Sequence, residues 1–178
     1  MIHVESCYWK ETLAQYAKKF KHKTKPPRWS ERSEINFEKD IVISMFMVRW
    51  LAERYKLSSN TIKLSLQIFR SPCIGKVSNL NRCSIDALYD FKREEMVAQN
   101  TIFVCNQLIH SGVMYAYRDK NRNWDGVKVC SDYERQKYVY RIPVSEVIKV
   151  LETAANDYPH TMLFNYCDKK QDFIINTN

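Results

Sequence analysis

The spacing of apolar residues along the chain predicts four long helices. In residues 5–22 the apolar side chains recur three and four positions apart, which places them on one face of a helix. Residues 33–56 contain an almost unbroken apolar run in their middle, as is typical of a buried central helix. Residues 93–110 and 144–156 also have helical periodicity. Together these segments predict a helical core.

A different pattern predicts strands, most of them in the second half of the chain. Residues 61–69 alternate apolar and polar side chains, as a half-buried strand does. Aromatic and β-branched residues favour further strands at 113–117, 127–129 and 138–142, and a final hairpin formed by 162–166 and 172–175. The sequence therefore predicts an α+β fold, mainly helical, with a small antiparallel sheet, in a single domain spanning residues 1–178.

One face of the 93–110 helix carries amides and a histidine, where a solvent-facing helix normally carries lysine and glutamate. At about 100° per residue, five polar side chains lie within roughly 120° of one another: Gln99, Asn100, Asn106, Gln107 and His110. Amide and imidazole groups donate and accept hydrogen bonds, so such a face needs polar partners. Nucleic acid, a substrate, a second subunit and a polar core network all satisfy this need, and the pattern does not choose among them.

The positive charge of the chain is concentrated in one segment. The formal net charge is +8, and six positive charges with no acid between them fall within residues 17–28. They are Lys18, Lys19, Lys21, Lys23, Lys25 and Arg28. With Phe20 and Trp29 among them, these cations suit single-stranded nucleic acid, whose phosphates attract cations and whose bases stack on aromatic rings. A solvated helix end followed by a basic, proline-containing linker at 23–30 is the alternative.

Several classes of function lack their sequence signatures. The 3 glycines form neither a glycine-rich phosphate loop nor a dinucleotide fingerprint, and the 6 cysteines have no zinc-ligand spacing. The first residues carry no secretory signal pattern, and the longest apolar stretch is too short to span a bilayer. We therefore expect a cytoplasmic protein without cofactor, metal or membrane association.

Three carboxylates recur at helical spacing. On one continuous helix Asp86, Asp90 and Glu94 would line a single face, which is able to hold a divalent ion. Like charges at that spacing repel unless they are neutralised. A solvated face is therefore the favoured interpretation, and no metal site is predicted.

Asn106 and His110 are four residues apart, so on a helix they lie on the same face. His110 would fall in the last helical turn, where the helix dipole favours the protonated imidazole. The pair resembles the end of the ribonuclease motif of the HEPN family, in which an Arg and a polar residue precede a His near a helix end. Cys105 stands where the motif has its Arg, and Arg93 is too distant to replace it. The resemblance implies a helical homodimer with His110 near the dimer axis, an inactive or altered site, and a role in prokaryotic defence or mobile-element systems.

A winged-helix DNA-binding domain is a competing interpretation. Exposed amides on the 93–110 helix would suit adenine edges in a major groove. Asp125-Gly126 predicts a turn in the following hairpin, whose tip offers Arg118, Lys120 and Arg122 as phosphate contacts. Against this interpretation, residues 103–116 contain no Lys or Arg to anchor phosphates.

These observations leave three hypotheses. The leading one is a small protein that binds nucleic acid, RNA ahead of DNA, with the lysines attracting phosphates and the amide face contacting bases. If it is catalytic, we expect metal-independent RNA cleavage with His110 as general base toward the ribose 2′-hydroxyl, which the missing Arg disfavours. The second is a structural protein whose amide-rich helix face packs against its twin in a homodimer. The third is the winged-helix regulator.

Overall fold

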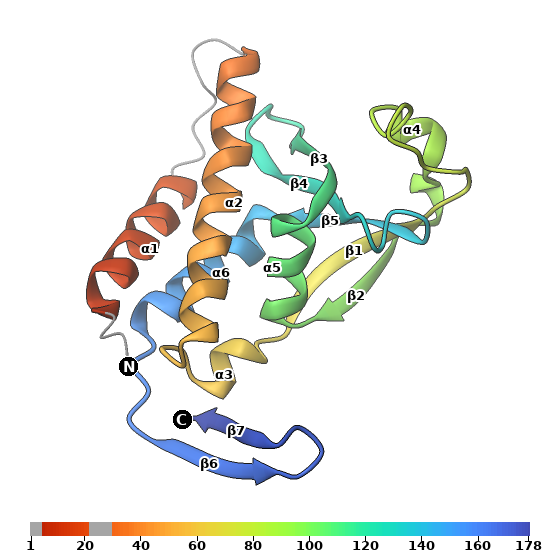
Figure 1. The fold of residues 1–178 in the computed structure, drawn as a ribbon. Coiled ribbons are helices and arrows are strands. Elements are labelled where there is room, and N and C mark those ends of the chain that lie inside the picture. Colours follow the sequence, from red (N-terminus) through yellow and green to blue (C-terminus); the bar gives the residue numbers. More distant parts are fainter. Residues whose placement is uncertain (1–4, 22–29) are drawn as a thin grey trace.

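The computed structural model describes residues 5–21 and 30–178 and combines helices with antiparallel strands (Figure 1). The helices are α1 (Ser6–Lys21), α2 (Glu31–Glu53), α3 (Ser59–Ile62), α4 (Ile85–Leu88), the 3-10 turn η1 (Phe91–Arg93), α5 (Thr101–Ile109) and α6 (Val144–Asn156). The strands are β1 (Leu66–Pro72), β2 (Glu95–Gln99), β3 (Ser111–Arg118), β4 (Trp124–Ser131), β5 (Tyr138–Pro143), β6 (Met162–Cys167) and β7 (Asp172–Thr177). The α+β class is therefore confirmed, and the strands form a larger part of the fold than the small sheet that we expected.

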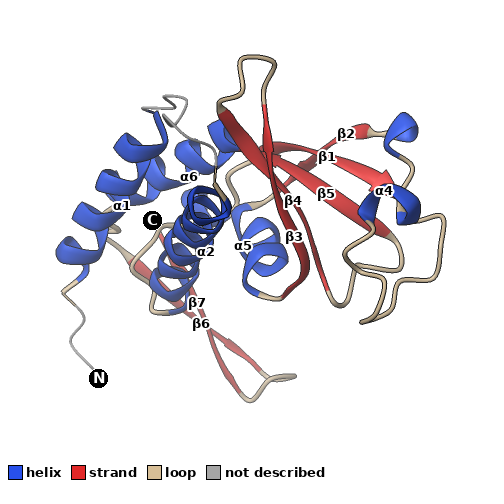
Figure 2. Cartoon of the chain, turned by 90° about the horizontal axis from the view of Figure 1, so that it is seen from above, coloured by secondary structure: helices blue, strands red, loops and turns tan. Residues whose placement is uncertain are grey.

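Five strands form one antiparallel sheet in the order β2-β1-β5-β4-β3, while β6 and β7 pair only with each other. Seen from above, the long helices lie on one side of the five-stranded sheet (Figure 2). α5 and α6 contact its strands, α2 packs on α5, and α1 packs on α6. The main hydrophobic core fills the space between these helices and the sheet.

The helices predicted at 5–22, 33–56 and 144–156 are confirmed as α1, α2 and α6, within a few residues at each end. Ser30 begins α2 with a capping box, because its hydroxyl accepts the N–H of Ser33 and the hydroxyl of Ser33 accepts the N–H of Ser30, both at 3.2 Å. Apart from Ser30, the linker predicted at 23–30 lies outside the described residues.

The long helix predicted at 93–110 is wrong in its first half. Glu95–Gln99 is strand β2, which pairs antiparallel with β1, with Leu66 opposite Gln99. Asn100 then begins α5 as its N-cap, and its side chain accepts the N–H of Phe103 at 2.8 Å. Pairing with β1 supplies the backbone hydrogen bonds of this segment, so tertiary structure overrides its helical periodicity.

The strands predicted at 113–117, 127–129 and 138–142 are confirmed within β3, β4 and β5, but the turn predicted at Asp125-Gly126 is wrong. The chain reverses earlier, where Asp119 accepts the backbone N–H of Asn123 through its side chain at 2.8 Å. Gly126 lies inside β4, where a Cβ atom would meet the carbonyl oxygen of Ile142 at 2.2 Å. This glycine therefore permits close strand packing.

The first half of the strand predicted at 61–69 also forms a short helix instead. Ser58 caps α3, because its hydroxyl accepts the N–H of Thr61 at 3.4 Å, and the strand β1 begins only at Leu66. None of the helices in residues 5–21 and 30–178 has the length and apolar character needed to cross a membrane.

Candidate functional site

A cavity of about 840 Å³ lies where α5 ends, between α2 and the loop that joins β4 to β5. Its lining combines cationic, acidic, amide and aromatic side chains. It includes Arg49, Phe103, Asn106, His110, Ser131, Asp132, Tyr133 and Glu134. Both residues that the sequence nominated as catalytic, Asn106 and His110, therefore lie in the wall of one cavity.

Arg49 meets Asn106 inside this cavity, although the two are far apart in the sequence. The guanidinium Nη1 donates a hydrogen bond to the Asn106 side-chain oxygen at 2.8 Å, and Nε pairs with Glu53 at 2.7 Å. Sequence reasoning missed Arg49, although a single cation in the apolar middle of a predicted helix is an available signal. Folding thus places Arg49 beside Asn106 and His110, although the residue directly before Asn106 in the sequence is Cys105 and not an arginine.

His110 ends α5 and is exposed to solvent. Its backbone N–H donates to the carbonyl of Asn106 at 3.1 Å, and its own carbonyl accepts the N–H of Asp132 at 3.2 Å. A second cavity, of about 210 Å³, shares Arg49, Asn106 and His110 with the larger one. These three side chains therefore stand at the junction of two hollows, where a guanidinium and an imidazole can contact an anionic group together.

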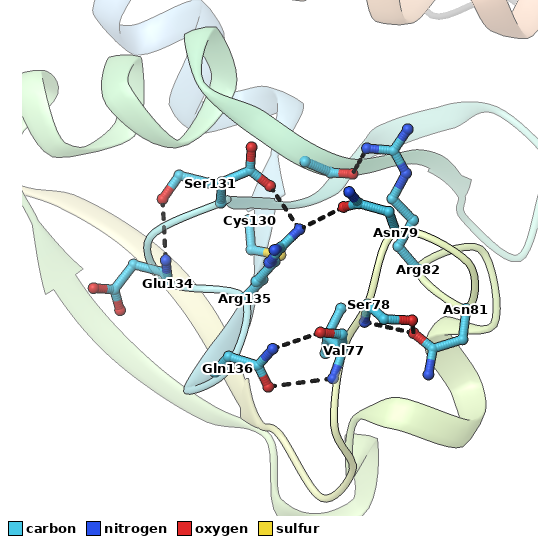
Figure 3. A network of polar contacts seen from close by, with 12 residues as sticks. Val77, Ser78, Asn79, Asn81, Arg82, Cys130, Ser131, Glu134, Arg135 and Gln136 are labelled. Atoms are coloured by element: carbon cyan, nitrogen blue, oxygen red, sulfur yellow. Dashed lines mark hydrogen bonds and ion pairs between the residues drawn. The ribbon is translucent and has the colours of Figure 1, made fainter.

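The opposite wall of the larger cavity is held by a network of polar contacts (Figure 3). Arg135 donates to Asn79 at 3.1 Å and to Asp132 at 3.0 Å. Gln136 accepts the backbone N–H of Val77 at 3.2 Å and donates to its carbonyl at 2.5 Å. These bonds fix the β4–β5 loop against residues 76–82, so this wall is built in advance of any ligand.

Acidic and aromatic groups complete the rim. Glu134 accepts the hydroxyl of Tyr140 at 3.2 Å and pairs with Lys137 at 3.1 Å. Tyr133 is 82% exposed, and the ammonium group of Lys137 lies 4.5 Å from its ring centre. Burial raises the pKa of Cys105, which lies behind the cavity in α5, to about 12, so this thiol stays protonated and is not a nucleophile.

The predicted basic residues lie elsewhere, at the end of the molecule where α1 ends and α2 begins. Lys18, Lys19 and Lys21 are exposed in the last turn of α1. Lys19 pairs with Asp40 of α2, and Lys21 with Glu152 of α6. Lys23, Lys25, Arg28 and Trp29 lie outside the described residues, in the segment that follows Lys21 in the sequence.

The tip of the β3–β4 hairpin lies at this same end (Figure 1). A row of aromatic contacts joins the two segments: Phe20 of α1 meets Phe37 of α2 at 5.9 Å, and Phe37 stacks on Trp124 of β4 at 5.1 Å. Arg118 lies over the ring of Trp124 at 5.3 Å, and Lys120 and Arg122 are exposed at the hairpin tip. We call these exposed cations, together with Lys18, Lys19 and Lys21, the basic end.

The amide-rich helix face does not exist as one surface. Gln99 lies in β2, and Asn100 caps α5. Asn106 is bonded to Arg49, while Gln107 is only 4% exposed and accepts the N–H of Ser131 at 2.9 Å. Every residue of α5 is buried or half-buried, so this helix presents no free face for a major groove.

The three carboxylates of the proposed acidic face are also separated. Asp86 is on α4, and Asp90 accepts the N–H of Lys92 and pairs with Arg93. Glu94 forms a two-bond ion pair with Arg141 of β5, with the shortest contact at 2.6 Å. No group of three potential metal-ligating acids, histidines or cysteines gathers anywhere in the described part of the chain.

Comparison with known proteins yields no relative. No family model, no curated protein and no solved structure matches the chain. The resemblance to the HEPN family stays a prediction.

Proposed function

We propose that this protein binds single-stranded RNA at the basic end. The observation that carries the proposal is that two basic segments far apart in the sequence lie at the same end of the molecule. These segments are the end of α1 and the tip of the β3–β4 hairpin, and the Phe20–Phe37–Trp124 contacts link them. The sequence adds Lys23, Lys25 and Arg28 directly after α1. Phe20 and Phe37 are buried, so these rings hold the two segments together, and the exposed cations around them are the groups that attract the phosphates of a nucleic acid.

Two features favour a single strand over duplex DNA. The helix that precedes the hairpin, α5, is enclosed between α2 and the sheet and has no exposed residue to enter a groove. The cavity at Arg49 and His110 is open, with the exposed ring of Tyr133 on its rim. An unpaired base can enter such a cavity and stack on an aromatic ring, whereas a base in a duplex cannot.

The basic end and the cavity lie along the same helix. Phe37 and Arg49 are both on α2 and are separated by roughly 18 Å along its axis, at 1.5 Å per residue. A single strand held by phosphates at the basic end is therefore expected to place a later nucleotide at Arg49 and His110. Affinity should rise with strand length until this distance is spanned.

Fluorescence anisotropy with labelled single-stranded RNA and duplex DNA, across a salt series, tests the proposal. Replacing Lys18, Lys120 and Arg122 together with glutamine should weaken RNA binding at low salt by roughly tenfold or more. Because each lost phosphate contact lowers the salt slope of a single strand by about 0.7, the slope should fall by about 2. Equal binding by the variant and the wild type would refute a role for the basic end.

A matched control removes the same charge from the other end of the molecule. Lys63, Lys169 and Lys170 are exposed, on α3 and in the turn of the C-terminal hairpin (Figure 1). Their triple glutamine variant should keep most of the affinity and the salt slope. If both triple variants lose affinity equally, the protein attracts RNA only through its net charge.

A second candidate function, RNA cleavage without metal, is favoured by the Arg49–Asn106 contact next to His110. The imidazole would take the proton of the 2′-hydroxyl, whose oxygen attacks the adjacent phosphorus and forms a 2′,3′-cyclic phosphate. The P–O5′ bond breaks, the 5′-oxygen leaves with a proton from the imidazolium or from water, and the guanidinium would stabilise the charge that develops on the phosphate. The same RNA, incubated in EDTA and separated on a denaturing gel, tests this candidate. Cleavage that His110→Ala abolishes without a loss of RNA affinity supports it, and intact RNA with the wild type refutes it.

A further inference from the structure

The C-terminal hairpin of β6 and β7 is a separate two-stranded sheet at the end of the molecule opposite the basic end (Figure 1). At its base the hairpin is bonded to the rest of the protein, because the hydroxyl of Thr177 donates to the carbonyl of Leu57 at 2.6 Å. The backbone N–H of His160 donates to the carbonyl of Asn178 at 2.9 Å and joins the two ends of the hairpin. Both outer edges of the hairpin remain without a strand partner within the described residues. Because a hairpin of two strands is marginally stable by itself, this one needs further packing.

Apolar side chains line one face of the hairpin from Met162 to the turn, while Thr177, opposite Met162, is buried at the base of the same face. Residues opposite each other in an antiparallel pair point to the same face, and here Phe164 pairs with Ile175 and Tyr166 with Phe173. We call this surface the apolar hairpin face, made of Met162, Phe164, Tyr166, Phe173 and Ile175. At the base of this face Thr177 is buried and Ile175 half-buried, whereas its outer part, formed by aromatic side chains, is exposed in the monomer.

The exposed area of this face matches a weak interface that forms as the protein concentration rises. Met162 is 46% exposed, Phe164 58%, Tyr166 57% and Phe173 54%. A large side chain buries 150–250 Å² when fully covered, so each of these leaves roughly 100 Å² in water. Two such faces packed together remove about 800 Å² of side-chain surface, which lies in the range of weak or transient interfaces, below the about 1,200 Å² at which stable ones begin.

The charges on the hairpin favour a second copy over a polyanion. No charged side chain lies on the apolar hairpin face. In the rest of residues 161–178, Asp168 and Asp172 balance Lys169 and Lys170. Two copies can therefore approach at this end without the repulsion that a net charge of +8 creates elsewhere, and RNA is not attracted here.

We propose that the apolar hairpin face is a homodimer interface, in which the hairpins of two copies pack face to face around a two-fold axis. The contact is isologous, since the same side chains come from both copies, and it forms a small two-layer sheet. It leaves the basic ends of the two copies pointing away from each other. It also differs from a dimer through α5, where Asn106 and Gln107 already have partners within the monomer.

Sedimentation velocity over a range of protein concentrations tests the interface. The sedimentation coefficient of the wild type should rise from that of a monomer toward that of a dimer as the concentration increases, whereas the double variant Phe164→Ser, Phe173→Ser should stay a monomer. The matched control is Leu163→Ser with Ile174→Ser, because these residues are 55% and 41% exposed on the other face of the same hairpin. The control should associate as the wild type does.

Thermal unfolding provides the second readout. The melting temperature of a dimer rises with protein concentration, so that of the wild type should do so and that of Phe164→Ser, Phe173→Ser should not. A wild type that stays monomeric at every concentration overturns the proposal, as does an equal loss of dimer in both double variants. Flotation of wild-type monomers with neutral phosphatidylcholine vesicles would instead assign the face to a lipid surface and also overturn it.

Discussion

Replacing Gln107 with alanine distinguishes a structural amide from a ligand-binding one. Gln107 is buried on α5, and its side-chain oxygen accepts the N–H of Ser131 at the end of β4. Truncation leaves that buried N–H without a partner, which costs about 1–3 kcal/mol. It also removes one buried methylene group, which contributes about 0.8 kcal/mol. We therefore expect a loss of about 3 kcal/mol in the free energy of unfolding.

A second substitution at the same position separates these contributions. Gln107→Leu keeps the buried volume but removes the hydrogen-bond acceptor, so it should lower the free energy of unfolding by about 2 kcal/mol. Gln15→Ala is the control, because Gln15 is an exposed amide on α1, and its effect should stay within about 0.5 kcal/mol. For a chain of this size, a loss of 3 kcal/mol lowers the melting temperature by roughly 6–12 °C.

Urea unfolding followed by circular dichroism gives the three free energies, and RNA anisotropy well below the melting temperature gives the affinity. Gln107 also lines the cavity, but its side-chain oxygen is taken by Ser131, so Gln107→Ala should be destabilised and bind RNA as the wild type does. If Gln107→Ala is as stable as the wild type but loses RNA affinity, Gln107 contacts the ligand and our account of α5 is refuted.

Two further substitutions test packing and titration. Gly126→Ala should lower the free energy of unfolding by at least about 2 kcal/mol, because the new Cβ would lie 2.2 Å from a backbone oxygen. Gly75→Ala should lower it by less, because the new Cβ would lie 3.3 Å from the flexible side chain of Leu88. Thermal unfolding compares the two variants. Burial raises the pKa of Glu38, although it accepts the N–H of Ala116, so the folded protein holds this proton more tightly than the unfolded chain. The free energy of unfolding should therefore fall as the pH rises through the pKa values of Glu38 in the unfolded and the folded state. Glu38→Gln should be more stable than the wild type at neutral pH, but not below pH 4.5, and urea unfolding at both pH values measures the difference.

The contact between Arg49 and Asn106 explains why sequence reasoning reached only part of the candidate site. Asn106 and His110 stand out because they are close in sequence on a helix that ends at His110. Arg49 and Glu134 lie far from them along the chain and reach the cavity only when α2 and the β4–β5 loop pack around α5. The spacing of residues along the sequence does not predict that Arg49 and Glu134 come close to Asn106 and His110.

The segment before α5 shows the same limit for secondary structure. Glu95–Gln99 has a helical pattern, yet it becomes a strand because β1 offers its unpaired edge. The signal that could have stopped the predicted helix is Asn100-Thr101, an N-cap residue followed by the first helical position.

By itself the sequence determined the α+β class, the positions of α1, α2 and α6, the later strands and the C-terminal hairpin, because local periodicity and capping residues specify them. It also identified the basic segment after Ala17. Only the tertiary structure linked the end of α1 to the β3–β4 hairpin, enclosed the amides of α5 and left the outer part of one face of the β6–β7 hairpin exposed. The physical reason is that these features depend on contacts between distant residues, whose free energy is gained only when the chain has folded.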